Sequence, residues 1–171
     1  MTLKVKFQKN KYTKKKNLEE IINLKSKEWK FRRKSQINWI KKNLKEKDIH
    51  VTLKYKNKLI GYTMLRNRVL IDKNKIKKNF YFFDTHLIDI KFRNKLINKK
   101  SPSHFLMKNI LNYILKNKKI SFLLCKKKLT NYYKFHNWKI MDQKKYKIKN
   151  NKKLILISFG KINIKSCLIS I

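Results

Sequence analysis

Glycine, proline, cysteine and acidic residues are all scarce in this sequence, and alanine is absent. The two glycines, Gly61 and Gly160, cannot form a GxGxxG dinucleotide loop or a Walker phosphate loop, so both motifs are excluded. The two cysteines, Cys125 and Cys167, form no CxxC pair and are too few for a disulfide framework, so we expect a cytoplasmic protein. Cys125 ends an apolar run, which favours a core position over a nucleophile. The four histidines lack metal-ligand spacing with these cysteines, and we predict no metal.

Long apolar runs are missing as well. No uninterrupted run approaches the ~18 residues of a membrane span, and the N-terminal stretch MTLKVKFQKNKYTKKKN lacks the apolar core of a signal peptide. With 171 residues, of which 42% are hydrophobic, the chain can bury one core of ordinary size. We expect a single domain over residues 1–160, followed by a tail or extra edge strand over residues 161–171.

Positive charge dominates, because 48 basic residues face nine acidic ones and give a formal net charge of +39. Such a charge suggests a polyanionic partner. However, only five of the basic residues are arginine, and the abundance of Lys, Asn and Ile is typical of an AT-rich genome. The basic residues are also interleaved with apolar ones along the whole length, as on the solvated faces of ordinary elements. Nucleic-acid binding therefore stays open but is not the favoured interpretation.

Hydrophobic periodicity predicts a mixed α+β fold with the order strand, helix, helix, three strands, helix, strand, helix and two strands. The expected strands are residues 2–7, 49–55, 59–70, 80–92, 120–125, 138–143 and 153–160. The second and third of these are joined by a tight turn at Asn57 and Lys58, and a polar connection over residues 72–79 precedes the long fourth one. Arg66 and Arg68, at the third strand, are interpreted as part of a solvated face, with binding of an anionic substrate group as the alternative.

Helix starts are predicted from capping residues. Asn17 is the expected N-cap of the first helix, with two glutamates in its first turn, and the second helix is expected to begin near Ser35. Ser101 and Pro102 form the best helix start in the chain, because serine caps well and proline suits the first helical position. A short helix is expected over residues 129–136.

That short helix carries the most specific local signal. The stretch YYKFHNW resembles the phrase with which GNAT N-acetyltransferases end their last helix, with Tyr133 on the family's tyrosine and Trp138 on its final aromatic residue. Asn137 takes the place of the family's glycine, since both residue types adopt the left-handed conformation that ends a helix. The resemblance, supported by the order of elements, implies a curved mixed sheet flanked by helices and transfer of acetyl from acetyl-CoA to an amine.

The resemblance also implies roles for this helix in catalysis and CoA binding. Tyr133 would be the general acid that protonates the departing CoA thiolate, because a phenol near the sulfur can donate a proton. The alternative is that Tyr133 only packs against its neighbours. Asn131, on the same helix, is carried over as a CoA-binding residue.

Two further segments match the family's CoA-binding features. The stretch NKKSPS stands where the family has its glycine-rich pyrophosphate loop, and an ordinary capped helix is the alternative for this stretch. The fourth strand matches the one whose exposed backbone binds the pantetheine arm. The resemblance thus implies that CoA is bound by Leu87, Ile88, Asp89, Ile90, Asn98, Lys99, Lys100, Ser101 and Ser103.

A base is expected because an ammonium substrate must lose its proton before it attacks the thioester. Asp84 and His86 share one strand face at a spacing of two residues and are the candidates, with a structural role or a water-mediated base as alternatives. The leading hypothesis is an N-acetyltransferase that uses acetyl-CoA and acts on a small-molecule amine. Its rivals are a basic nucleic-acid-binding protein and a CoA-binding GNAT fold without turnover. The acceptor and the oligomeric state cannot be read from the sequence.

Overall fold

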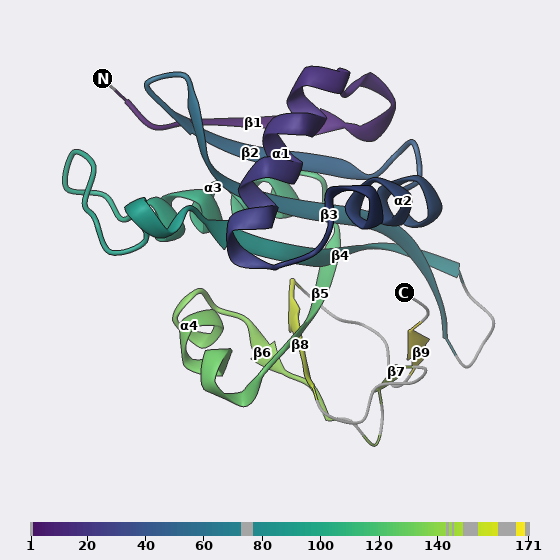
Figure 1. Cartoon of the computed structure of the whole chain (residues 1–171). Coiled ribbons are helices and arrows are strands. Elements are labelled where there is room, and N and C mark those ends of the chain that lie inside the picture. The colour runs from purple at the N-terminus through teal and green to yellow at the C-terminus, as the bar shows by residue number, and fades with distance from the viewer. Residues whose placement is uncertain are drawn as a thin grey trace. The chain divides into compact units, whose positions relative to one another are not determined.

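A computed structural model describes residues 2–72, 77–142, 144, 146–148, 154–160 and 167–169 of the chain (Figure 1). The chain forms two compact units. Unit 1 comprises Met1–Arg66 and Thr85–Ile110, and unit 2 comprises Asn67–Asp84 and Leu111–Ile171. Among the described residues, no helix is both long enough and apolar enough to cross a bilayer.

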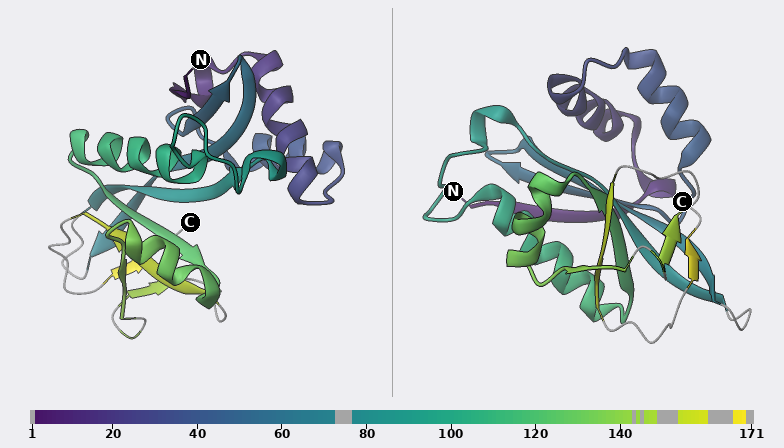
Figure 2. Two further views of the ribbon diagram at one scale, coloured as in Figure 1. Left: turned by 90° about the vertical axis from the view of Figure 1, so that its left-hand side faces the viewer. Right: turned by 90° about the horizontal axis from the view of Figure 1, so that it is seen from below.

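Unit 1 is built on antiparallel pairing of β1 with β2 and of β2 with β3. Its elements in chain order are β1 (Lys4–Lys9), the 3₁₀ helix η1 (Asn10–Tyr12), α1 (Lys15–Glu28), α2 (Arg33–Asn43), β2 (Ile49–Tyr55), the first part of β3 (Lys58–Asp72), the end of β4 (Lys77–Ile88), the 3₁₀ helix η2 (Ile90–Phe92) and the beginning of α3 (Pro102–Lys116). Figure 2 shows α1 and α2 on one face of these strands and the beginning of α3 on the other. Both faces of the unit 1 sheet therefore carry a helical layer.

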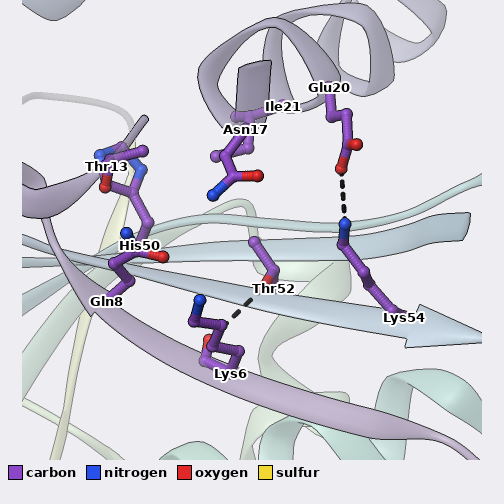
Figure 3. Close-up of a pocket in the computed structure, with 9 residues that line it drawn as sticks. All are labelled: Lys6, Gln8, Thr13, Asn17, Glu20, Ile21, His50, Thr52 and Lys54. Carbon is purple, nitrogen blue, oxygen red and sulfur yellow. Dashed lines mark hydrogen bonds and ion pairs between the residues drawn. The ribbon is translucent and has the colours of Figure 1, made fainter. Parts of the chain in front are cut away.

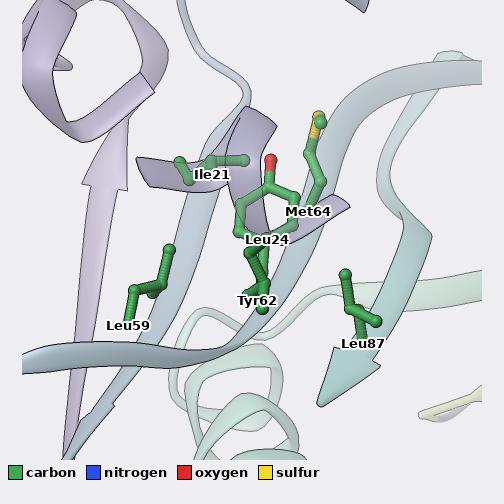
Figure 4. Close-up of a cluster of buried hydrophobic side chains, with 6 residues drawn as sticks. All are labelled: Ile21, Leu24, Leu59, Tyr62, Met64 and Leu87. Atoms are coloured by element: carbon green, nitrogen blue, oxygen red, sulfur yellow. The ribbon is translucent and has the colours of Figure 1, made fainter. Parts of the chain in front are cut away.

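The core of unit 1 forms where α1 meets β3 and the end of β4 (Figure 4). Helical spacing places Ile21 and Leu24 on the buried side of α1, and alternation along β3 turns Tyr62 and Met64 toward them. Gly61 directly precedes Tyr62 in β3, and a side chain there would meet the Ile88 Cδ1 atom at 2.7 Å, so glycine lets β3 and β4 pack closely. The core cluster consists of Ile21, Leu24, Leu59, Tyr62, Met64 and Leu87.

The N-cap predicted for the first helix is wrong by three residues, and the second helix, expected to begin near Ser35, begins two residues before it. α1 begins at Lys15, so Asn17 and both glutamates lie inside the helix, and α2 begins at Arg33, so Ser35 lies inside as well. The residues before these helices are Lys14 and Arg32, and neither makes a side-chain capping bond. Capping chemistry therefore does not position these two starts. In contrast, α3 begins at Pro102, as predicted.

Unit 2 contains the remaining strands and the short helix. After the rest of α3 come β5 (Ile120–Cys125), the 3₁₀ helix η3 (Lys127–Leu129), α4 (Thr130–Phe135), β6 (Lys139–Ile140), β7 (Tyr146–Ile148), β8 (Ile155–Phe159) and β9 (Cys167–Ile169). β5 and β6 both pair antiparallel with β8. β9, in the segment predicted as a tail, pairs with β7 and with the end of β3. The core of this unit consists of Leu70, Phe80, Phe82, Phe122 and Leu156.

The strand order β1-β2-β3-β4-β5-β8-β6, with four helices, confirms the predicted mixed α+β fold. The predicted boundaries of the long fourth strand need correction. β4 begins at Lys77, inside the expected polar connection, and it ends at Ile88 because η2 follows. Residues 73–76 of that connection lie outside the described residues. β7 was not predicted.

Among the described residues, most left-handed backbone positions are occupied by residues other than glycine. The chain has few glycines, and positive φ angles are adopted by Lys56, Asn57, Thr85, Asn98, Lys99, Lys118 and Asn137. Lys56 and Asn57 form the two-residue turn between β2 and β3, one residue earlier than predicted. Lys118 lies two residues after the last residue of α3. There the Lys119 amide donates to the Ile114 carbonyl and the Lys118 amide donates to the Leu115 carbonyl. Lys118 thus adopts the left-handed conformation that glycine usually adopts after the last turn of a helix.

The lysine at this position predicts a stabilising substitution. Lys118→Gly should raise the free energy of unfolding by about 1 kcal/mol, because glycine adopts the left-handed conformation without a Cβ clash. Lys108→Gly is the matched control, since Lys108 is also exposed but lies in the interior of α3, where glycine costs roughly 0.5–1 kcal/mol. Urea unfolding of both variants measures the effect. Equal destabilisation by the two substitutions would contradict this account of the helix end.

Candidate functional site

The end of β4 presents backbone groups away from β3. The Asp89 amide donates to the Ile60 carbonyl on β3 at 2.8 Å. Because the peptide bond is trans, the Ile88 carbonyl on the other side of that peptide points away from β3. It accepts a hydrogen bond from the Arg93 guanidinium at 3.2 Å, which uses one of its two lone pairs. Of the backbone stretch predicted to bind CoA, residues 87–90, we therefore retain only the peptide groups around Ile88 as candidates.

Asp89 and Ile90, which were expected to lie in the strand, follow its end. Asp89 is buried, and its carboxylate accepts from the Lys27 ammonium at 2.8 Å and from the Lys91 amide at 3.1 Å. Burial alone would raise the pKa of Asp89, but these hydrogen bonds and the charges of Lys27 and Lys58 lower it overall. Ile90 lies in η2 and is 68% exposed. The Asp89 carboxylate therefore joins α1 to the end of β4.

Arg93 forms a second link between the same elements. Its guanidinium donates to the Glu28 carboxylate at 2.6 Å as well as to the Ile88 carbonyl. Lys27 and Glu28 are the last two residues of α1. Each forms an ion pair with a residue that follows β4: Lys27 with Asp89, and Glu28 with Arg93. This arrangement fixes the backbone around Ile88.

The stretch predicted as a pyrophosphate loop is a tight turn followed by a helix. Asn98 and Lys99 both have positive φ, and Ile97 and Lys100 exchange two backbone hydrogen bonds around them. The Lys100 amide is therefore used within the turn. Its ammonium group lies 5.5 Å from the Phe105 ring centroid, beside the first turn of α3. The exposed Lys99 and Lys100 thus lie directly before the start of α3. The stretch does not form the open loop of backbone amides that was expected.

The structure brings together His86 and Ser103, two of the predicted site residues. Ser103 lies in the first turn of α3, and its hydroxyl oxygen is 3.1 Å from the Nε2 atom of His86. The Nδ1 atom of His86 is 2.9 Å from the Thr63 hydroxyl on β3. Both ring nitrogens are thus engaged. Ser101 directly precedes the helix and is half-buried.

Asp84 and His86 do not continue one regular pleat. Thr85 between them has a φ of +59°, which is rare for a β-branched residue and interrupts the alternation of strand faces. The spacing of two residues therefore does not by itself place the two side chains on one face. Strained backbone of this kind is concentrated at functional sites.

In unit 2, the last turn of α4 holds Tyr133 in place. The Trp138 amide donates to the Tyr133 carbonyl and the Asn137 amide donates to the Lys134 carbonyl, while Asn137 has a φ of +61°. This pattern is a Schellman motif, and its usual hydrophobic contact is present because the Tyr133 and Trp138 rings lie 6.0 Å apart. The predicted left-handed role of Asn137 is confirmed. Asn131, earlier on the helix, is exposed.

Tyr133 is buried among aromatic rings. It is 8% exposed, and its ring contacts those of Phe83 on β4 and Trp138 edge-on. Burial raises the pKa of Tyr133, and the nearby Tyr132 and Cys125 raise it further, so the phenol stays neutral at physiological pH. The contacts predicted for a packing role are therefore present, and so is the protonated state that a general acid requires.

A separate pocket of about 160 Å³ opens in unit 1 between α1 and the strands β1 and β2 (Figure 3). Glu20 on α1 and Lys54 on β2 form an ion pair at 2.8 Å in its wall. His50 is buried there, with Nδ1 2.8 Å from the Tyr62 hydroxyl and Nε2 3.0 Å from the Asn10 amide oxygen. The pocket is lined by Lys6, Gln8, Thr13, Asn17, Glu20, Ile21, His50, Thr52 and Lys54, none of which was predicted as a site residue.

Sequence analysis missed this polar layer, although a signal for it exists. His50, Thr52 and Lys54 alternate along β2 and pair with polar residues of β1.

The interpretation of Arg66 and Arg68 as a solvated face is wrong, because they are only 9% and 6% exposed. Arg66 instead lies 5.6 Å from the Trp39 ring centroid. Long side chains can bury their stems beneath aromatic rings, which a strand pattern does not reveal.

Comparison with solved structures identifies the fold. An acyl-CoA N-acyltransferase from Pseudomonas aeruginosa matches with a TM-score of 0.63 and 12% identity, over 92% of this chain and 99% of that one. The chain has the GNAT fold. PaiA N-acetyltransferase from Thermoplasma acidophilum, in complex with coenzyme A, matches the same fold with a TM-score of 0.56 and 14% identity, over 94% and 100%. The ribosomal-protein-S18-alanine N-acetyltransferase of Escherichia coli gives 0.59 and 9%, over 94% and 99%. No protein-family model and no curated protein sequence matches the chain.

The buried histidine of the pocket predicts a pH-dependent stability. Burial lowers the pKa of His50 to about 4, while Asp48 opposes and Lys25 adds to the effect. Between about pH 6.5 and pH 4, His50 is therefore protonated in the unfolded chain and neutral in the folded chain. The contribution of His50 to the free energy of unfolding is fully present above about pH 6.5 and is lost as the pH falls toward 4. From pH 7 to pH 5 we expect a loss of about 2 kcal/mol from His50 alone.

His50→Gln should remove that part of the pH dependence in urea unfolding at pH 7 and pH 5. His104→Gln is the control, because His104 is an exposed histidine on α3. Identical pH dependence in the wild type and in His50→Gln would show that His50 is not held neutral.

Proposed function

We propose that this protein is an N-acetyltransferase that transfers acetyl from acetyl-CoA to an amine. The observation that carries the proposal is the end of β4, where the Ile88 carbonyl points away from β3 and the chain leads through a tight turn into α3. In unit 2, the parallel pairing of β4 with β5 covers Phe80–Phe82, and the next residue of β4, Phe83, packs on Tyr133 instead. The shared fold with acyltransferases, one of them bound to coenzyme A, supports the same activity.

The residues around the end of β4 suit an extended pantetheine arm. An amide of the arm would donate to the second lone pair of the Ile88 carbonyl, as an added strand does. Arg93 would remain on the first lone pair and hold the peptide in place. Leu87 is buried on the core side, and the chain leaves the extended path after Asp89, where η2 begins at Ile90.

The start of α3 suits the pyrophosphate. The first-turn amides and the positive end of the helix dipole favour an anion at this point. Ser101 and Ser103 add hydroxyl groups, and the exposed Asn98, Lys99 and Lys100 add polar and positive side chains. These residues replace the glycine-rich loop that the sequence lacks. We assign Asn131 on α4 to CoA binding as well, as the resemblance implies.

The chemistry requires one proton donor and one proton acceptor. The amine nitrogen attacks the thioester carbonyl, the C–S bond breaks, and the departing thiolate takes a proton from a nearby acid. We assign that acid to Tyr133, whose phenol is buried at the last turn of α4 and carries its proton. The mechanism requires the phenol to reach the sulfur of the bound thioester.

The proton of the attacking amine leaves to water in this proposal. His86 is already bonded through both ring nitrogens to Thr63 and Ser103. Asp84 is half-buried on β4 and remains the candidate for a base acting through water.

The test is a change of one hydroxyl group. Tyr133→Phe should lower kcat by roughly 10- to 100-fold and leave the KM for acetyl-CoA unchanged, because the hydroxyl acts only as the C–S bond breaks. Thiol release is measured with acetyl-CoA and a panel of a polyamine, an amino sugar, an amino acid and a peptide N-terminus. The matched control is Tyr132→Phe, since Tyr132 is the adjacent, less buried tyrosine. Equal kcat for wild type and Tyr133→Phe, or no thiol release with any amine, would reject the assignment.

A further inference from the structure

The pocket between α1 and the strands β1 and β2 is formed by residues that regular periodicity places together. Lys6 on β1 pairs with Thr52 on β2, and both line the pocket from the face of the strands that α1 covers. Asn17, Glu20 and Ile21 are three and four residues apart on α1, so they share the helix face above these strands. In the sheet, β3 separates β2 from β4, and the pocket is therefore distinct from the proposed CoA site.

The side chains of this pocket leave one positive charge without a counter-charge. Lys54 and Glu20 form an ion pair at 2.8 Å. Among the residues that the structure describes, the Lys6 ammonium and the Asn17 side-chain amide have no hydrogen bond or ion pair. Figure 3 shows the Asn17 amide pointing from α1 toward the strands. An ammonium group and an amide N–H₂ group are thus available as donors on opposite walls of the pocket.

The other walls add no charge at neutral pH. Burial lowers the pKa of His50 to about 4, so its imidazole is neutral, and both ring nitrogens are already engaged by Tyr62 and Asn10. Ile21 is 1% exposed and supplies an apolar surface. A matching ligand therefore carries one negative charge beside a short apolar part.

We propose that this pocket binds a small monocarboxylate anion, whose carboxylate accepts hydrogen bonds from the Lys6 ammonium and the Asn17 amide. The anion brings the net charge of the pocket's side chains to zero, and hydrogen bonds between charged groups are the stronger ones. Lys54 contacts the Oε2 atom of Glu20, and the Oε1 atom can accept from a hydroxyl group next to the ligand's carboxylate. The proposal does not depend on the binding of acetyl-CoA.

The size of the pocket limits the length of the ligand. Its volume of about 160 Å³ is similar to that of an engineered cavity of ~150 Å³ that admits benzene, a molecule of about six non-hydrogen atoms. Lactate has this size, one negative charge, a methyl group and a hydroxyl group beside the carboxylate. It is therefore the probe that we choose.

Titration with lactate, followed by the backbone amide signals of the protein in NMR spectra at constant ionic strength, tests the proposal. Lactate should shift the signals of Asn17 and Thr52 saturably, with one lactate per chain. Lactamide has nearly the same shape without the charge and should bind about tenfold more weakly. Equal binding of lactate and lactamide, or equal shifts of these signals with inorganic phosphate, would overturn the proposal.

Two substitutions locate the site. Lys6→Gln removes the ammonium group and should weaken lactate binding about tenfold. Lys9→Gln is the matched control, because it removes the same charge from another exposed lysine of β1 that does not line the pocket, and affinity should stay within about twofold.

Asn17→Asp changes the amide to a carboxylate of the same size. It should abolish lactate binding, because the new carboxylate pairs with Lys6 and repels the anion. An aspartate in the first turn of α1 also suits the positive end of the helix, so we expect this variant to fold. Unchanged affinity in both Lys6→Gln and Asn17→Asp, or the absence of saturable lactate binding by the wild type, would overturn the proposal and leave the acetyl-CoA site unaffected.

Discussion

A β-strand offers hydrogen bonds along two edges, and β4 shares one of its edges with β5 over Phe80–Phe82 only. Phe83, the next residue of β4, packs edge-on against the Tyr133 and Trp138 rings. Further along, the left-handed Thr85 interrupts the pleat, and the Ile88 carbonyl turns away from β3. The candidate site depends on this incomplete pairing, because a strand paired along both edges has no backbone groups left for a ligand.

The scarce acidic residues join elements of unit 1 to one another. Asp89 and Glu28 link α1 with the residues that follow β4, and Glu20 links α1 with β2. Exposed ion pairs contribute little to stability on their own, yet the Asp89 carboxylate is buried and has a lowered pKa. α1 is thereby held against the strand that carries the proposed pantetheine contact. The excess lysines have few acidic partners and raise the attraction for any polyanion, CoA included.

Much of the fold follows from periodicity, and the exceptions have identifiable physical causes. The predicted boundaries of β2 and β5 are confirmed to the residue because apolar alternation ends at polar turns. Pro102 and Asn137 are confirmed because their backbone preferences are local. The N-cap predicted at Asn17 was wrong because α1 begins after Lys14, which makes no capping bond. The contacts of His86 and Asp89 join distant segments, so no local pattern could reveal their partners.

The most direct test of the central claim is calorimetric titration of the wild type with acetyl-CoA at about 50 mM and about 500 mM salt. A pocket built on backbone groups and a helix start predicts saturable binding of one acetyl-CoA per chain that weakens only moderately at the higher salt concentration. Binding of several molecules per chain that disappears at high salt, or no binding at either concentration, would contradict the account, because lysine charge alone would then explain any attraction.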